Sequence, residues 1–174
     1  MPVRDDEILR LTKYAQGLGL KVKFLTRSRK SPAAEWTLDG TEITVYTNSS
    51  TTKIDIILSL IHELGHHVWF IHEKNRQPDL KFEEAIERQN LHESELSDTP
   101  APKALRKKIL NTEIAGTQWW DVIYRDTNCK FPKWRLEANK EFDIWVYNVY
   151  YLTGHFPSKK EGRAKFKEIK RKYK

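Results

Sequence analysis

The sequence predicts an α+β fold, in which a small antiparallel three-stranded sheet packs on a mainly helical core. Two observations carry this prediction. Short segments with strand character occur early in the chain, at 21–26, 35–38 and 42–47, with an Asp39-Gly40 turn signal between the last two. Most other segments place apolar residues at helical spacing.

Helices of three turns or more are expected at five places. The first covers Asp5 to Gly17 and ends at glycines that suit a helix stop. The second, from Thr52 to His72, is apolar on most of its faces and should be mostly buried. Aromatic-rich helical patterns from Lys103 to Arg125 and from Trp134 to Leu152 should pack on this central helix, and a basic helix is expected at 158–174.

We expect a single domain spanning 1–174, because a chain of this length supports one compact core whereas two independent cores would each be marginal. A polar insertion at 73–102, with a short helix around Phe82 to Arg88, interrupts the helical pattern. Hydrophobic residues make up 39% of the chain and charged residues 32%, which argues against extensive disorder.

The sequence predicts a cytoplasmic location. Met1 to Leu11 lacks the features of a signal peptide, and no run of 18 apolar residues occurs, so no membrane contact is expected. The one cysteine, Cys129, has no partner for an internal disulfide and makes a cysteine-based zinc site implausible.

Much of the net charge of +7 is concentrated in the basic segment 158–174. This segment could attract polyanions, so a weak nucleic-acid contact is one interpretation. The favoured alternative is a solvated amphipathic helix, with Ala164, Phe166 and Ile169 partly facing the core.

The central helix contains a His-Glu-x-x-His motif, His62-Glu63-Leu64-Gly65-His66. Residues four apart lie on one helix face, so His62 and His66 can present two imidazole nitrogens to one ion. Glu63 lies at the edge of that face, where it can act as the general base on a zinc-activated water. Without metal, two histidines and a carboxylate on a buried helix are costly unless they satisfy one another.

Gly65 adds a packing signal to this motif. A glycine inside a helix costs about 1 kcal/mol relative to alanine, so its presence between the two histidines predicts that another helix packs very closely there.

With this motif after a helix and a short sheet, the chain resembles the minimal gluzincins, zinc metallopeptidases of the ImmA/IrrE type that phages and mobile elements carry. The resemblance covers about residues 5 to 125, and its specific part is His62 to His66. It implies a zincin-like domain, Zn²⁺ as the cofactor, and an intracellular protein or peptide substrate. It also implies that the strand before the metal helix is a sheet edge to which a peptide adds, a role that falls to Ile43, Val45 and Tyr46.

A catalytic zinc ion usually takes three protein ligands, so a third must come from elsewhere. Glu113 is preferred, because Gly116, three positions on, would let its helix approach the metal helix at Gly65. Glu137 is the alternative. It lies in the segment Glu137-Ala138-Asn139, which resembles part of a glutamate-rich helix in peptidases of this type. His72 has the ten-residue spacing from His62 that metzincins use, but a continuous helix carries it about 9 Å along the axis from His66.

A hydrogen-bond donor is also expected for the oxyanion that peptide hydrolysis creates. Tyr147 is assigned to substrate binding in this role, and Tyr150, Tyr151 and His155 are alternatives for it. His67 is expected to be a packed or surface histidine.

Two functional hypotheses remain at this point. The first is a zinc-dependent metallopeptidase that hydrolyses peptide bonds of an intracellular protein, with Glu63 as general base. The alternative is a catalytically silent zincin-fold binding module that contacts a host protein or nucleic acid through its basic surface.

Overall fold

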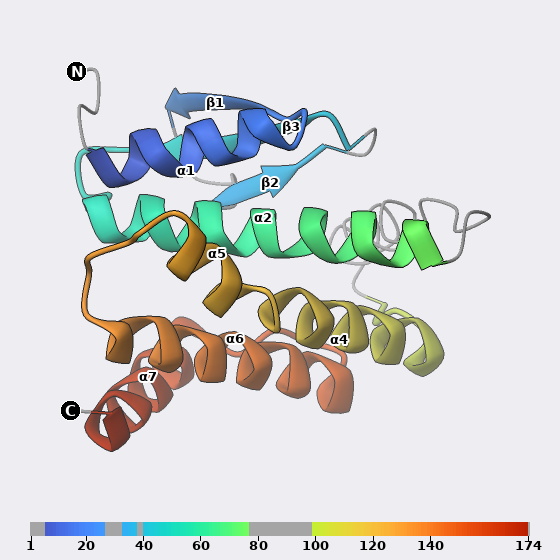
Figure 1. Cartoon of the computed structure of the whole chain (residues 1–174). Helices are drawn as coiled ribbons and strands as arrows, with labels where there is room; N and C mark the ends of the chain where they lie inside the picture. Colours follow the sequence, from blue (N-terminus) through green and yellow to red (C-terminus); the bar gives the residue numbers. More distant parts are fainter. Residues whose placement is uncertain (1–5, 27–32, 38–39, 77–98, 174) are drawn as a thin grey trace. The chain divides into compact units, whose positions relative to one another are not determined.

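A computed structural model describes residues 6–26, 33–37, 40–76 and 99–173 (Figure 1). The described elements are, in chain order, α1 (Asp6–Gly17), β1 (Lys21–Thr26), β2 (Ala34–Trp36), β3 (Glu42–Thr47), α2 (Lys53–Arg76), α4 (Lys103–Thr117), α5 (Trp120–Asp126), α6 (Lys133–Thr153) and α7 (Lys159–Tyr173). The predicted α+β class is confirmed. The helix expected at Phe82 to Arg88 lies outside the described residues, and so does most of the insertion at 73–102.

The chain forms two compact units. The first comprises Met1–Leu80 and Gly116–Phe131, and the second comprises Lys81–Ala115 and Pro132–Lys174. The last two residues of α4, Gly116 and Thr117, belong to the first unit together with α2 and α5, whereas the rest of α4, which includes Glu113, belongs to the second unit. The single domain expected from chain length stays a prediction.

The sheet of the first unit is mixed, in the strand order β1-β3-β2. β2 pairs with β3 antiparallel, as expected, but β1 pairs with β3 in parallel, Val22 lying opposite Ile43. The fully antiparallel sheet predicted from the sequence is therefore wrong. Alternation of side chains identifies a strand and its buried face, but it does not identify the neighbour with which the strand pairs.

This order makes β3 the central strand. Ile43 lies between Val22 of β1 and Trp36 of β2, and Val45 lies between Phe24 and Ala34. Ile43 and Val45 are fully buried. The prediction that β3 forms a sheet edge open to a peptide is therefore wrong, because both of its hydrogen-bonding edges are already used within the sheet. The Tyr46 hydroxyl donates to the Glu35 carboxylate on β2.

The central helix of the first unit is α2, which packs against α1, β2, β3 and α5. It begins with a reciprocal cap, because the Thr52 amide donates to Asp55 at 2.8 Å and the Asp55 amide donates to the Thr52 hydroxyl at 3.2 Å. By length and composition alone Lys53–Asn75 could cross a membrane, but 61% of its most apolar window is buried inside the protein. The core helix of a folded protein passes the same test.

Where the sequence predicts one helix from Lys103 to Arg125, the structure has two, α4 and α5. The chain turns between them, and the Trp119 amide donates to the Gly116 carbonyl at 3.1 Å. Periodicity alone does not reveal this break, because apolar residues continue at helical spacing on both sides of it.

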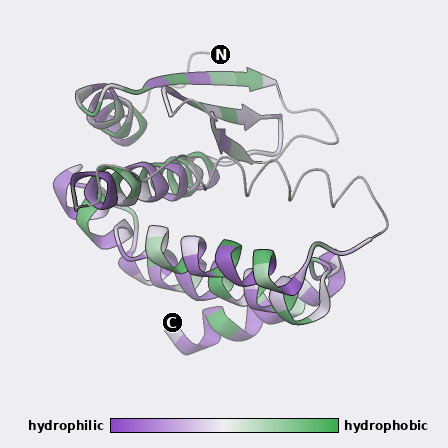
Figure 2. Cartoon of the chain, turned by 90° about the vertical axis from the view of Figure 1, so that its right-hand side faces the viewer, coloured by the Kyte–Doolittle hydropathy of each residue, from purple (hydrophilic) through white to green (hydrophobic). Residues whose placement is uncertain are grey.

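In the second unit, α7 packs along α6. The Phe142 and Phe166 rings lie 5.1 Å apart, and the Lys172 ammonium pairs with Glu141 at 2.6 Å. Ile169 is buried, as the amphipathic interpretation of this helix requires, whereas Ala164 is exposed. Figure 2 shows α7, the helix beside the C-terminus mark, as mostly hydrophilic with a short hydrophobic band.

Candidate metal centre

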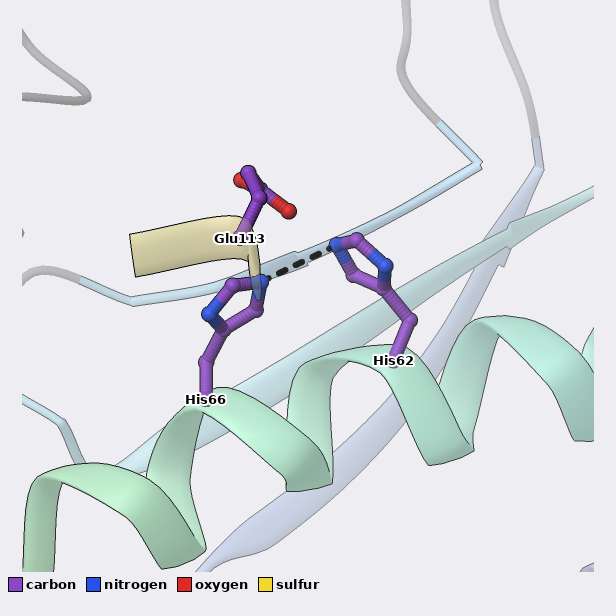
Figure 3. A group of neighbouring side chains, drawn as sticks. All are labelled: His62, His66 and Glu113. Atoms are coloured by element: carbon purple, nitrogen blue, oxygen red, sulfur yellow. Dashed lines mark hydrogen bonds between the residues drawn. The ribbon is translucent and has the colours of Figure 1, made fainter. Parts of the chain in front are cut away.

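One face of α2 carries the two motif histidines. The His62 and His66 rings face each other with their centroids 4.8 Å apart, and their Nε2 atoms lie 3.2 Å apart (Figure 3). His66 is 1% exposed, and the side chain of His62 is 19% exposed. His66 is therefore buried, whereas part of the His62 side chain reaches solvent.

The chain packs very closely on α2 beside these histidines. A Cβ atom added to Gly65 would lie 2.6 Å from the Gly116 carbonyl oxygen, and one added to Gly116 would lie 2.7 Å from His66 Nδ1. Both distances are shorter than real Cβ contacts, so neither position has room for a side chain. The close approach predicted at Gly65 is present, and Gly116 is the residue that makes it.

Trp120, the first residue of α5, forms a wall of this site. Its ring centroid lies 5.8 Å from that of His62, and the side chain is 2% exposed. In the sequence, Trp120 is one of several aromatic residues in its segment. Its position four residues after Gly116, the glycine that contacts α2, is the signal that could have placed it at the site.

Glu113 completes the group. It lies one helical turn before Gly116 on α4, and its side chain is buried, with 5% of the residue exposed. One ligand atom from each of His62, His66 and Glu113 lies within 4.8 Å of the other two. These are the residues that the sequence analysis chose as metal ligands, and Figure 3 shows their side chains directed toward one another.

The geometry of the histidine pair fits a bound ion. Two nitrogen ligands of a tetrahedral zinc ion, each at 2.0 to 2.1 Å from it, lie about 3.3–3.4 Å apart. The observed separation of the two Nε2 atoms is 3.2 Å, which is also the length of a hydrogen bond between the two rings, drawn as the dashed line in Figure 3. Two imidazoles and one carboxylate are also a donor set that catalytic zinc sites use.

Glu63 lies next to this group without belonging to it. It is 4% exposed, and its Oε1 atom lies 3.9 Å from His62 Nε2. A carboxylate at this distance from a ligand nitrogen is placed to exchange a proton with a small molecule bound beside the histidines.

The other ligand candidates lie elsewhere. His72 is exposed, with its Nδ1 atom 3.3 Å from the Glu73 carboxylate and its ring 5.1 Å from that of Trp119. Glu137 lies on α6, where its carboxylate is 3.8 Å from the Lys140 ammonium. Neither belongs to the group of three.

Two further sequence assignments concern aromatic contacts. The Tyr147 ring packs edge-on against Phe156, with 5.7 Å between their centroids. The expected role of Tyr147 in substrate binding stays a prediction. His67 is a packed histidine, 5.4 Å from the Trp36 ring, and burial lowers its pKa against the opposing effect of the Leu18 backbone.

Comparison of the chain with protein-family models, curated proteins and solved structures found no match. The functional interpretation therefore depends on the residues of the site itself.

Proposed function

We propose that this chain is a zinc-dependent metallopeptidase of the minimal gluzincin type, acting on an intracellular protein or peptide. The observation that carries the proposal is the grouping of His62, His66 and Glu113, with ligand atoms within 4.8 Å of one another, beside the buried carboxylate of Glu63. The resemblance of the motif to the ImmA/IrrE-type enzymes supports the same assignment.

The roles of the residues follow from their positions. His62, His66 and Glu113 would hold the metal ion. When bound, zinc supplies Lewis-acid polarisation of a carbonyl group and lowers the pKa of water. Glu63, whose carboxylate lies 3.9 Å from His62 Nε2, would accept the proton of the attacking water and return it to the leaving amine. This is hydrolysis by general-base catalysis, in which no covalent bond forms between the chain and its substrate.

The first test is the metal content of the purified protein, by elemental analysis after dialysis. We expect about one zinc per chain in the wild type, loss of that zinc in the His62→Ala and His66→Ala variants, and its retention in Glu63→Gln. Circular dichroism establishes that each variant is folded. Absence of a bound divalent metal from folded wild-type protein would overturn the proposal.

The second test concerns activity. Zinc-loaded wild type and the Glu63→Gln variant are each incubated with a peptide library prepared from cytosolic proteins, and new peptide termini are identified by mass spectrometry. Cleavages that require Glu63 support the peptidase. Zinc binding without any such cleavage would instead favour the silent binding module, whose interactions do not depend on Glu63.

A further inference from the structure

A regular row of cations runs along α7. Lys159, Arg163, Lys167 and Arg171 follow one another at intervals of four residues, and all four are exposed. Residues four apart lie on one face of a helix with a rise of about 6 Å, so the row is about 18 Å long. We call these four residues the α7 row.

The acidic side chains near this row are engaged with other groups. Glu161 accepts from the Ser158 amide at 2.8 Å and from its hydroxyl at 2.6 Å, which caps the start of the helix. Glu168 pairs with Lys165 at 2.6 Å, and Glu141 of α6 pairs with Lys172. Within residues 99–173, no carboxylate forms an ion pair with a member of the α7 row.

The apolar side of α7 is already covered. Ile169 is 1% exposed, Phe166 packs on Phe142, and the Tyr173 hydroxyl donates to Glu141 at 2.8 Å. The helix is thereby fixed on α6 with the row facing solvent. A helix that lies in a membrane interface needs a free apolar face to insert between lipids, and α7 has used that face within the protein.

An aromatic side chain lies next to the C-terminal part of α7. The Trp134 ring has the Lys170 ammonium 5.9 Å and the Arg135 guanidinium 5.3 Å from its centroid. Cations beside an aromatic ring are a combination typical of surfaces that bind nucleic acid. It extends the positive surface from α7 onto the first turn of α6.

We propose that the α7 row binds the phosphate backbone of nucleic acid without sequence specificity. A nucleic-acid strand carries a phosphate about every 3.4 Å along a duplex, so a row of cations about 6 Å apart can reach a phosphate at each position. Contacts of this kind fix a protein on a duplex without distinguishing bases. The interaction is independent of the metal centre.

The test measures the salt dependence of binding to a fluorescein-labelled 20-base-pair DNA duplex, by fluorescence anisotropy between 50 and 200 mM salt. Four phosphate contacts predict a slope of log K against log[salt] of about −3.6, since each contributes about −0.9. Replacing three members of the row, in the variant Arg163→Gln, Lys167→Gln and Arg171→Gln, should reduce the slope to about −0.9. The single variant Lys167→Gln should make the slope less negative by about 0.9.

A matched control removes the same charge elsewhere. The variant Lys13→Gln, Lys21→Gln and Lys103→Gln loses three exposed lysines that lie outside the row. We expect it to keep the wild-type slope, and a variant with Arg163→Lys and Arg171→Lys, which preserves the charge of the row, to keep it as well. Circular dichroism verifies that the substituted helix is folded.

Three results would overturn the proposal. Equal loss of binding in the triple variant of the α7 row and in the control variant with Lys13, Lys21 and Lys103 replaced would show that only the overall charge matters. Binding of the wild type to phosphatidylserine vesicles but not to the duplex would assign the row to a lipid surface. Absence of any salt-dependent binding to the duplex would show that the row makes no phosphate contacts.

Discussion

Gly65 of α2 lies against the backbone carbonyl oxygen of Gly116, so closely that a Cβ on Gly65 would be 2.6 Å from that oxygen. The contact is reciprocal, because the space that a Cβ on Gly116 would occupy is filled by the His66 ring. The two glycines thus bring the C-terminal end of α4, at Gly116, onto the helix that carries the histidines.

The Gly65→Ala variant is expected to be destabilised by about 1–3 kcal/mol, because the new methyl group meets backbone and the Trp120 indole rather than a flexible side-chain end. Helix propensity alone would have the opposite effect, a gain of about 1 kcal/mol. Urea unfolding of the metal-free protein measures the sign directly.

Gly162 of α7 provides the control, because it is also inside a helix but a Cβ there would meet only Phe142 Cζ at 3.6 Å, an ordinary contact. Gly162→Ala should leave stability unchanged or raise it by about 1 kcal/mol. A gain of stability in both variants would contradict the close packing at Gly65.

The third ligand can be assigned by comparing two glutamates. Glu113→Gln is expected to lower the zinc affinity by more than about 100-fold, since even partners outside the coordination shell change it by about 10–100-fold. Glu137→Gln should leave it unchanged, because this carboxylate lies beside Lys140. Competition with a fluorescent zinc chelator measures both. Equal affinities for the two variants would remove Glu113 from the site.

The Glu7 carboxylate is expected to stabilise the fold at neutral pH but not in acid. Burial raises its pKa, but the backbone amides of Lys130 and Phe131 and the Lys53 ammonium lower it more, so the net shift is downward. A carboxyl group with a lowered folded-state pKa stabilises the fold above its unfolded value of 4.5, and this contribution is lost as the pH falls through the folded-state pKa. Glu7→Gln should therefore cost about 1–3 kcal/mol at pH 7 and progressively less as the pH falls below 4.5.

Urea unfolding in the presence of a chelator measures this difference free of any effect of metal loss. Glu168→Gln serves as control, because the carboxylate of Glu168 is exposed and its ion pair with Lys165 should contribute at most about 1 kcal/mol at either pH. A penalty for Glu7→Gln that stayed constant from pH 7 to pH 3 would contradict the predicted role of the charge.

The phenol of Tyr46 is expected to lose its proton at a higher pH than an ordinary tyrosine. Its hydrogen bond to the Glu35 carboxylate, with burial and the charges of Glu35 and Glu42, raises its pKa from 10.0 to about 12. The stabilisation that the neutral phenol gives is complete below pH 10 and is lost as the pH rises to about 12. In absorbance titrations at alkaline pH, Glu35→Gln should bring this transition down toward 10, whereas an unshifted transition would show that the hydrogen bond has no such effect.

Local structure was predictable where the pattern depends on nearby residues. Strands β1 and β3 have the expected bounds, and α2 has the expected character, because side-chain alternation and helical periodicity are properties of a short segment. The strand order was not predictable. In the parallel pairing Lys21 lies opposite Glu42, and the alternation of side chains within each strand does not specify which strand lies beside it. The two histidines followed from their spacing alone. Glu113 was selected through Gly116, by a packing argument. Trp120 was missed because its link to Gly116 depends on the turn between α4 and α5, which helical periodicity does not reveal.

The order β1-β3-β2 also constrains how the protein folds. The last strand in sequence, β3, lies between the two earlier ones, so β1 and β2 do not pair with each other. No part of the sheet can therefore form before β3 is available. A chain segment that ends at Trp36 should therefore remain without a sheet. Because α2 follows β3 after only the turn at 48–52, sheet closure and docking of the histidine-bearing helix are expected to occur as one cooperative step, late relative to the formation of α1.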